Sequence, residues 1–336
     1  MKPLRVLLSA VVATAMAFGF SPSTAQGQCP ADLNGDGQIN QADVAQLLAN
    51  SGPVPFPPPE FLIVPAWATL LEASPDPAVV TDANLRAAIV ASGFAWRIKD
   101  TLSDIEMVLV PAGTFMMGCS ASNSHACNQV PDSDESPTHQ VTLSAFYIGR
   151  YEVTQAQWTA KMGSNPSYFS GYSDSPSRPV EQVSWNKVAS GSTSFMSLTG
   201  LRLPTEAEWE YAYRAGTTTA YHSYPAQPNG FNDDTLLGNI AWINSNSGRQ
   251  THAVGGKFAN ALGIHDMAGN VAEPTQDFSG PYSSGSVTNP TGPATGSLRM
   301  SRGGGWGSYD CRASVRGGDS PSDIDETGGF RAARNP

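Results

Sequence analysis

The sequence predicts an α+β fold with low regular secondary structure, and three observations lead to this class. The 33 glycines and 26 prolines among 336 residues interrupt the chain often, so long helices and strands are not expected. Several short helices are marked at their ends by capping residues. Short runs of alternating apolar and polar residues are typical of strands. Only 14% of the residues are charged, which is typical of a loop-rich globular chain and not of a disordered one.

Residues 1–25 have the pattern of a secretory signal peptide. Lys2 and Arg5 precede an apolar run over residues 6–20, and the small residues at 23–25 form a cleavage site. The apolar run is too short to span a membrane comfortably, so no transmembrane segment is expected in the mature chain. The protein is therefore predicted to be secreted, either to the extracellular space or to the periplasm or cell surface.

A calcium-binding loop is predicted within residues 29–50. The run DLNGDGQINQAD places oxygen-bearing side chains at the spacing of an EF-hand-type loop, with Gly37 at the sharp turn. The predicted ligands, with Gln38 acting through its backbone carbonyl, are Asp32, Asn34, Asp36, Gln38, Asn40 and Asp43. An aspartate in the last position resembles the dockerin variety of this loop, although no second repeat follows. Residues 51–60 then form a Pro-rich linker.

The segment 61–104 is predicted to be a helical preface to the main domain. One helix is expected over Ala66–Ala73. A second is expected over Asp82–Ser92, and Gly93 marks its end. Both helices are expected to pack on the domain that follows them.

The main domain is predicted to span residues 105–336 and to begin with strands. Residues 106–118 predict a strand, a Pro-Ala-Gly turn and a second strand. Residues 139–151 alternate as a further strand. After residue 217 regular structure becomes sparse, and short ordered islands are expected within long loops.

Three helices are predicted in the first half of this domain. Capping and stop residues bound them at Thr154–Gly163, Ser184–Leu198 and Thr205–Gly216. The last helix is marked most strongly, because Thr205 and Glu208 have the spacing of a capping box.

The chain contains four cysteines, which are Cys29, Cys119, Cys127 and Cys311. In an oxidising compartment Cys119 and Cys127 are the expected disulfide, because this pair closes a short loop rich in serine and asparagine. Cys29 and Cys311 can pair with each other or stay free, and the sequence leaves both alternatives open.

Several separated motifs of the main domain resemble, in the same order, those of the formylglycine-generating enzyme family, the sulfatase-modifying factors. They include EMVLVPAGTFMMG at 106–118, LRLPTEAEWEYA at 201–212, NALGIHDMAGNVAE at 260–273 and GGFR at 328–331. The resemblance covers over two thirds of the chain. It implies a compact α+β fold that is related to the C-type lectin fold and contains little regular secondary structure.

The resemblance also implies that calcium binds to two loops of the domain. One site would use Asn239 and the backbone of Ile240. The other would use Asp266, backbone oxygens of Gly269 and Val271, and Glu273. Carboxylates interleaved with carbonyl oxygens suit a hard cation such as calcium.

The copper chemistry of the formylglycine-generating enzymes is not expected in this chain. The resemblance implies copper held between two cysteines a few residues apart, since paired thiolates select copper(I). The matching segment here contains Cys311 alone, and Gly305 replaces a serine of the motif. An iron site remains open as an alternative, with His252, His265 and Asp266 assembled across loops.

The C-terminal motifs carry a cluster of arginines for which two roles are open. The arginines either line a cleft for anions or a peptide, or pin loops through bidentate bonds to Asp and Glu. The residues assigned to the cleft are Arg302, Trp306, Arg312 and Arg316, and Arg331 belongs to the same arginine cluster.

The formal net charge of −10 argues against a nucleic-acid partner. We predict a secreted, calcium-binding member of the family that acts as a binding or accessory module, with a carbohydrate or a peptide as its ligand. The alternative is an iron- or copper-dependent oxidoreductase of the same family that acts on a thiol or peptide substrate.

Overall fold

The computed structural model describes residues 62–119 and 134–336. The predicted signal peptide, EF-hand-type loop and Pro-rich linker lie outside these residues, and so does Cys127. Contacts divide the chain into two units, Met1–Pro55 and Phe56–Pro336, and the described residues all belong to the second.

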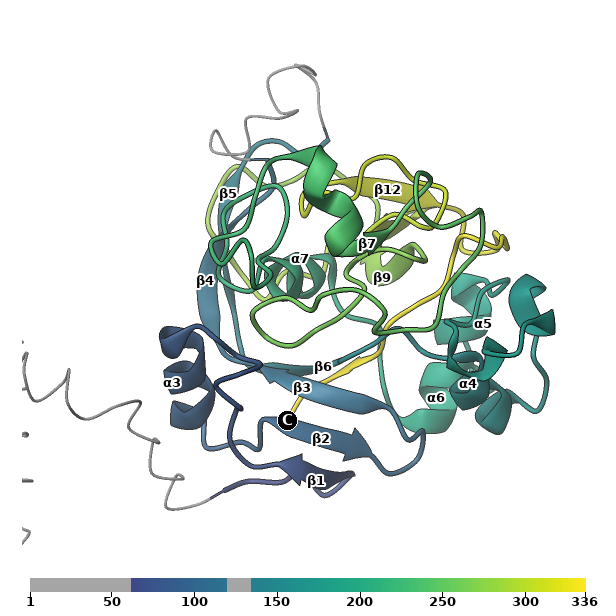
Figure 1. Cartoon of the computed structure of the whole chain (residues 1–336), viewed down its shortest axis with the longest axis horizontal. Coiled ribbons are helices and arrows are strands. Elements are labelled where there is room, and N and C mark those ends of the chain that lie inside the picture. Colours follow the sequence, from purple (N-terminus) through teal and green to yellow (C-terminus); the bar gives the residue numbers. More distant parts are fainter. Residues whose placement is uncertain (1–61, 120–133) are drawn as a thin grey trace, which may run out of the picture. The chain divides into compact units, whose positions relative to one another are not determined.

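A five-stranded antiparallel sheet with the order β1-β2-β3-β6-β13 forms one layer of this unit (Figure 1). Its strands are Ala68–Glu72, Arg97–Asp100, Glu106–Val110, Phe146–Gly149 and Ala333–Arg334. The predicted strand at the start of the main domain is confirmed as β3. Val108 and Ile148 pair across β3 and β6 and are fully buried, as expected for β-branched residues in a central strand.

The prediction of a helix over residues 66–73 is wrong, because this segment forms β1. Its alanine, leucine and glutamate residues favour a helix locally, but β1 pairs in antiparallel register with β2 from Ala68 opposite Asp100. Pairing with a neighbouring strand overrides such a weak local preference. The segment predicted as a helical preface therefore contributes two strands to the same sheet as the main domain.

The second helix predicted in this segment is confirmed as α3, Ala83–Ala91. Asp82 caps it by accepting from the backbone N–H groups of Asn84 and Leu85, both at 2.8 Å. Gly93, with φ of 75°, follows its C-terminal end.

Three smaller sheets form the other part of the domain. The first contains β4 (Gly113–Met117), β5 (His139–Leu143) and β10 (Val287–Thr288), and the second contains β9 (Glu273–Phe278), β11 (Arg299–Arg302) and β12 (Arg316–Asp319). The third is the pair β7 (Ala241–Trp242) and β8 (Ala268–Gly269). The single strand predicted over 139–151 is thus two strands, β5 and β6, which belong to different sheets.

Short helices line the side of the domain labelled α4, α5 and α6 in Figure 1. The helix predicted after Thr154 is confirmed as α4, Gln155–Met162, with the capping box in place. The helix predicted from Ser184 to Leu198 is wrong in extent, because it divides into α5, Trp185–Ala189, and α6, Phe195–Thr199. The break contains Gly191 at φ of 78°, and Ser194 provides a new N-cap. Short 3-10 helices occur at η1 (Tyr168–Gly171), η2 (Ser175–Ser177) and η3 (Asp234–Asn239).

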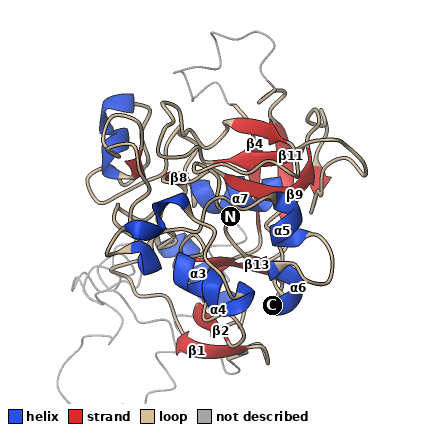
Figure 2. Ribbon diagram, turned by 90° about the vertical axis from the view of Figure 1, so that its right-hand side faces the viewer, coloured by secondary structure: helices blue, strands red, loops and turns tan. Residues whose placement is uncertain are grey.

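Helix α7, Glu206–Arg214, lies inside the domain and contacts β4, β9 and β11 (Figure 2). The predicted capping box of Thr205 and Glu208 is present. The helix ends one residue earlier than predicted, since Ala215 already adopts the left-handed conformation that was assigned to Gly216. Trp209, Ala212 and Tyr213 share one face of this helix and are fully buried in the core.

Within residues 62–119 and 134–336, none of the helices has both the length and the apolar character needed to span a bilayer.

Candidate functional site

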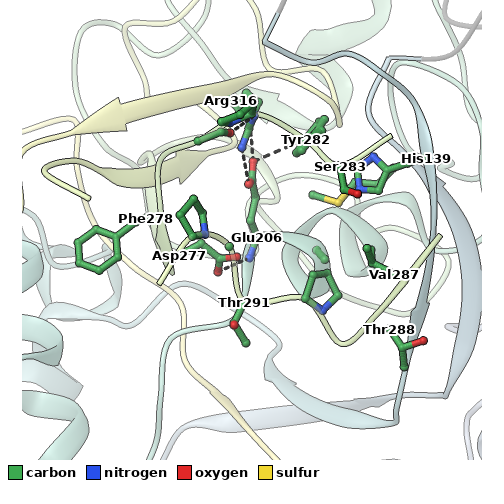
Figure 3. Close-up of a pocket in the computed structure, with 17 residues that line it drawn as sticks. His139, Glu206, Asp277, Phe278, Tyr282, Ser283, Val287, Thr288, Thr291 and Arg316 are labelled. Atoms are coloured by element: carbon green, nitrogen blue, oxygen red, sulfur yellow. Dashed lines mark hydrogen bonds and ion pairs between the residues drawn. The ribbon is translucent and has the colours of Figure 1, made fainter. Parts of the chain in front are cut away.

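A pocket of about 560 Å³ opens at the N-terminal end of α7, and we call it the α7 pocket. Figure 3 shows its lining side chains, which come from α7, β5, β9, β12 and the segment between β9 and β11. Its titratable residues are Glu206, Asp277, His139, Tyr282 and Arg316. Glu206, His139 and Arg316 are far in the sequence from one another and from Asp277 and Tyr282, so the pocket exists only in the folded domain.

Glu206 is the best-anchored residue of the α7 pocket. Its Oε1 accepts from Arg316 Nε at 2.8 Å, and its Oε2 accepts from Arg316 Nη2 at 2.6 Å. The hydroxyl of Tyr282 donates to Oε1 at 3.3 Å, and the Tyr282 ring lies 3.9 Å from the Arg316 guanidinium carbon. The bidentate pair fixes a negative charge at the pocket wall, and the ring covers the cation.

Asp277 is the second carboxyl group in the pocket and has a different environment. Its Oδ2 accepts from the backbone N–H of Glu206 at 2.9 Å, and the residue is 3% exposed. Burial raises the pKa of Asp277 to about 7, and the charges of Glu206 and Glu208 act in the same direction. Near neutral pH this carboxyl group can therefore either donate or accept a hydrogen bond, whereas Glu206 is held next to a cation.

His139 lies on the β5 side of the pocket. Its Nδ1 is 3.2 Å from the carbonyl oxygen of Pro137, which assigns the proton to Nδ1 and leaves Nε2 as an acceptor. The ring packs against Tyr282 with 4.9 Å between centroids. The pocket thus combines carboxyl groups, an imidazole and a guanidinium with an aromatic ring. Such a lining suits a small polar ligand.

The sequence did not indicate the α7 pocket. Glu206 belongs to a recognised motif, but Asp277, His139 and Tyr282 carry no spacing pattern. Their convergence depends on the tertiary structure, and the one available signal was that Glu206 opens a strongly capped helix whose first turn must meet other residues.

The arginines of the C-terminal motifs pin loops, which is the second of their two predicted roles. Arg312 binds both oxygens of Glu135, at 2.9 and 2.8 Å, and Arg331 binds Glu273 through Nε and Nη2. Arg302 pairs with Glu210 inside the core. Of the four residues assigned to a cleft, Arg316 lines the α7 pocket; Arg302, Trp306 and Arg312 do not.

Trp306 is anchored away from this pocket. Its Nε1 donates to the carbonyl oxygen of Glu326 at 2.8 Å, and its ring meets Phe169 edge-on at 6.0 Å. The four residues assigned to a cleft therefore do not line the α7 pocket together.

Cys311 does not fit a copper site. It is completely buried, and burial raises the pKa of its thiol to about 12, with the charge of Asp310 acting in the same direction. Cys119 takes part in a disulfide bond, and its predicted partner Cys127 is outside the described residues. Within the described ranges Cys311 is the single cysteine with a free thiol. One neutral thiol cannot supply the two thiolates that copper(I) requires.

The residues of the second predicted calcium site lie in a buried acidic cluster. Glu273 accepts from Trp209 Nε1 at 2.7 Å and from Arg331, while Asp266 accepts from the backbone N–H of Gly255 at 2.6 Å. The structure adds Glu152, which the sequence did not indicate. It accepts from Asn270 Nδ2 at 2.6 Å and from Val271 N at 3.1 Å.

The environment of this cluster disfavours the charged forms of two of its carboxyl groups. Burial raises the pKa of Glu152 well above its usual range, and the charges of Asp266 and Glu273 add to this effect. Burial likewise raises the pKa of Asp266 to about 6. Three buried carboxyl groups thus lie near one arginine, Arg331, and a divalent cation near Asp266 and the backbone oxygens of Gly269 and Val271 would favour their ionised forms. As they stand in the described residues, the three side chains do not form a metal-binding arrangement.

The first predicted calcium site fits a metal less well. The carbonyl oxygen of Asn239 accepts from Phe258 N at 3.2 Å, and its side chain donates to Leu236 O at 2.9 Å. The ammonium group of Lys257 donates to Gly238 O at 2.6 Å and lies 3.9 Å from the Trp242 ring centre. A cationic side chain therefore already closes the loop that was expected to bind calcium through Asn239 and Ile240.

The three residues considered for iron do not converge on one point. His252 places Nε2 at 2.7 Å from Ser247 O and stacks on Trp242, whereas His265 places Nδ1 at 3.0 Å from Lys257 O and stacks on Tyr151. Among residues 62–119 and 134–336, no group of three or more His, Cys, Asp or Glu side chains has the geometry to hold a metal ion.

In the described part of the chain, a five-stranded sheet, three smaller sheets, a buried helix that contacts two of them, and loops pinned by arginine–carboxylate pairs define an α+β domain with the formylglycine-generating-enzyme fold. The chain belongs to the family described by the sulfatase-modifying factor enzyme 1-like domain, whose model matches residues 97–336. That match begins eight residues before the predicted boundary at 105, in the strand β2.

Individual relatives agree with this assignment. The chain is 33% identical over 251 residues to the chaperone protein LppX of Paenibacillus barcinonensis, which covers 61% of this chain and 80% of the relative. It is 26% identical over 308 residues to the formylglycine-generating enzyme of Streptomyces coelicolor, covering 74% and 94%. Among solved structures, Treponema denticola variable protein 1 superimposes with a TM-score of 0.60 at 31% identity, covering 70% of this chain and 98% of that one.

Proposed function

We propose that the protein is a secreted, calcium-binding member of this family that acts as a binding or accessory module and does not use the copper–cysteine chemistry. The observation that carries the proposal is the state of Cys311, a buried and protonated thiol without a second free thiol among the described residues. A module of this kind binds a ligand without converting it, so its affinity and not a turnover rate is the quantity to measure.

Two features support a secreted module. The sequence begins with a signal-peptide pattern, and Cys119 is disulfide-bonded. Disulfides persist in oxidising compartments and are rare in the cytosol. The chaperone relative LppX supports an accessory role, since a chaperone acts on another protein and not on a small substrate.

Calcium binding is proposed from the carboxyl groups of Glu152, Asp266 and Glu273, although their side chains are not arranged as a metal site in the described residues. Arg331 pairs with Glu273, and a bound Ca²⁺ would favour the ionised forms of Glu152 and Asp266, whose pKa values burial raises. When bound, the ion would supply only structural stabilisation of the loop that contains Gly269 and Val271. The EF-hand-type loop at residues 32–43 is a separate proposed site for the same ion.

The α7 pocket supports binding of a carbohydrate or a peptide. Asp277 and Glu206 can accept from hydroxyl or amide groups, His139 offers a further acceptor, and the Tyr282 ring offers an apolar face. The acidic overall charge gives no reason to expect a nucleic acid.

Two measurements on the purified protein test the proposal together. Metal analysis should find calcium, and oxygen consumption with a thiol-containing peptide should not exceed the background rate. A screen of glycans and peptides should yield a ligand whose binding is lost in Asp277→Ala. Stoichiometric iron or copper that drives oxygen uptake would refute the proposed module and favour an oxidoreductase.

A further inference from the structure

A second pocket, of about 580 Å³, lies directly beside the α7 pocket, and we call it the Arg299 pocket. Both pockets are lined by Phe278, Thr291 and Pro293, so they form neighbouring parts of one surface. Figure 3 shows Phe278 and Thr291 at the margin of the α7 pocket. Two arginines line the second pocket. One of them, Arg299 on β11, has no carboxylate partner among the described residues.

Arg299 is held between two aromatic rings. Its guanidinium carbon lies 3.7 Å from the ring centre of Trp185 and 3.5 Å from that of Phe278. The Trp185 ring is itself fixed, because its Nε1 donates to Thr275 O at 2.9 Å. Stacking on both faces orients the planar guanidinium and leaves only its edges for hydrogen bonds.

The edges of this guanidinium are incompletely used. Nη1 donates to the carbonyl oxygen of Gln276 at 2.6 Å, in an exposed contact. Nε is buried and has no acceptor among the described residues. No carboxylate in the described part of the chain forms an ion pair with Arg299, in contrast to Arg302, Arg312, Arg316 and Arg331, which all have one.

The other arginine that lines this pocket is not available. Arg202 binds both oxygens of Glu208, at 2.6 and 2.7 Å, and also contacts Asn335. Its charge is therefore already compensated. The acidic group that interacts electrostatically with Arg299 is Asp277. Asp277 is buried and accepts a hydrogen bond from Glu206 N. Arg299 consequently remains a partly buried cation without a counter-ion.

A cation in this state favours an anion that enters the pocket. Removing charge from water is unfavourable unless a partner compensates it, and a planar guanidinium edge matches the two oxygens of a carboxylate. The polar residues Ser197, Gln276 and Thr291 also line this pocket. These groups can exchange hydrogen bonds with the hydroxyls of a sugar ring.

We propose that the Arg299 pocket binds an acidic sugar, a uronic acid residue whose carboxylate pairs with Arg299 while its hydroxyls contact Ser197, Gln276 and Thr291. This inference rests on the proposed function, because it specifies the carbohydrate ligand of the same binding module. It places the acidic residue beside the α7 pocket, so that the neighbouring sugar of a longer chain can reach Asp277.

The test is calorimetric titration of the whole protein with two matched ligands, methyl β-glucuronide and methyl β-glucoside, which differ only at the carboxylate. The wild-type protein should bind the glucuronide at least about tenfold more tightly, since a charge-assisted bidentate bond contributes on the order of 1.4 kcal/mol or more. Arg299→Gln should remove this preference, and Arg299→Lys should retain only part of it. Arg249→Gln changes an exposed arginine that does not line the pocket and should leave the preference unchanged.

Folding of each variant is checked by its melting temperature. A second readout needs no variant, since the indole N–H signal of Trp185 should shift on titration with the glucuronide and not with the glucoside. Equal binding of the two sugars, or a preference that survives Arg299→Gln, would overturn the inference while leaving the binding module intact. Tighter binding of an acidic peptide than of the glucuronide would also overturn it. No binding of any glycan or peptide would instead refute the proposed function.

Discussion

Arg316 of β12 binds both carboxylate oxygens of Glu206, the first residue of α7, at 2.8 and 2.6 Å. The side chain of Arg316 is 3% exposed and that of Glu206 is 6% exposed, so neither charge is stabilised by water. The pair joins a C-terminal strand to the central helix and forms one wall of the α7 pocket. Its removal therefore affects both stability and ligand binding.

We expect Glu206→Gln to lower the free energy of unfolding by about 3–5 kcal/mol, because Arg316 would remain buried without its partner. Urea denaturation followed by tryptophan fluorescence measures the change. As a matched control, Lys99→Gln breaks the exposed pair with Asp104 and should cost less than about 1 kcal/mol. Equal losses in the two variants would contradict the role given to the buried pair.

Asp277→Asn is expected to change the pH dependence of stability. The pKa of Asp277 in the folded protein, about 7, lies above its ordinary value of 3.8, so between these values the folded state keeps a proton that the unfolded state releases. The protonation of Asp277 therefore contributes to the wild-type free energy of unfolding. This contribution is complete below pH 4, decreases as the pH rises, and is lost once the pH has passed 7. Each pKa unit corresponds to about 1.4 kcal/mol.

Denaturation of wild type and Asp277→Asn across this range measures the effect as a difference. The variant should gain stability relative to the wild type between pH 4 and pH 7, and the difference should then level off. Asp277→Ala also removes the acceptor of Glu206 N–H and should be the less stable variant at low pH. Parallel curves for wild type and Asp277→Asn would show that Asp277 does not titrate in this window.

Calcium is expected to raise the melting temperature of the described domain through the cluster of Glu152, Asp266 and Glu273. Asp36→Ala removes a predicted ligand of the proposed EF-hand-type loop, so calorimetry of this variant isolates the cluster. In excess EDTA both Asp36→Ala and the wild type should melt several degrees lower than with calcium. In the double variant that carries both Asp36→Ala and Asp266→Asn, most of this difference in melting temperature should disappear. A melting temperature that does not change in excess EDTA would count against calcium binding at the cluster.

Cys311 is expected to resist alkylation in the native protein. It is completely buried and burial raises the pKa of its thiol to about 12, so both access and thiolate formation are suppressed. Mass spectrometry of the peptide that contains Cys311, after treatment with iodoacetamide at pH 8, should find modification only once a denaturant is added. Rapid modification of the native protein would indicate an open, reactive thiol and would reopen the possibility of redox chemistry.

Local signals allowed much of the helical structure to be predicted. The capping boxes at Thr154 and Thr205 depend on residues three positions apart, so α4 and α7 could be recognised before the fold was known. The segment that forms β1 carries a helical composition, and its strand state depends on pairing with β2, which no local pattern encodes.

The candidate sites depended on tertiary structure in the same way. The family motifs located Glu206, Asp266 and Glu273, because these residues stand in the motifs themselves. Asp277 and Glu152 lie in stretches without such a pattern, and their properties come from burial and from neighbours distant in sequence. The sequence left two roles open for the arginines, which were lining a cleft and pinning loops. Only the contacts in the folded structure could decide between these roles.

The arginine–carboxylate pairs that hold the loops together also affect the rate at which the domain can fold. Arg331 and Glu273 are 58 residues apart, Arg302 and Glu210 are 92 apart, Arg316 and Glu206 are 110 apart, and Arg312 and Glu135 are 177 apart. Each pair must bring distant parts of the chain together before its electrostatic energy is gained, and such long closures slow refolding. A chain in which these distant segments have not yet met would leave the arginines and carboxylates without their partners.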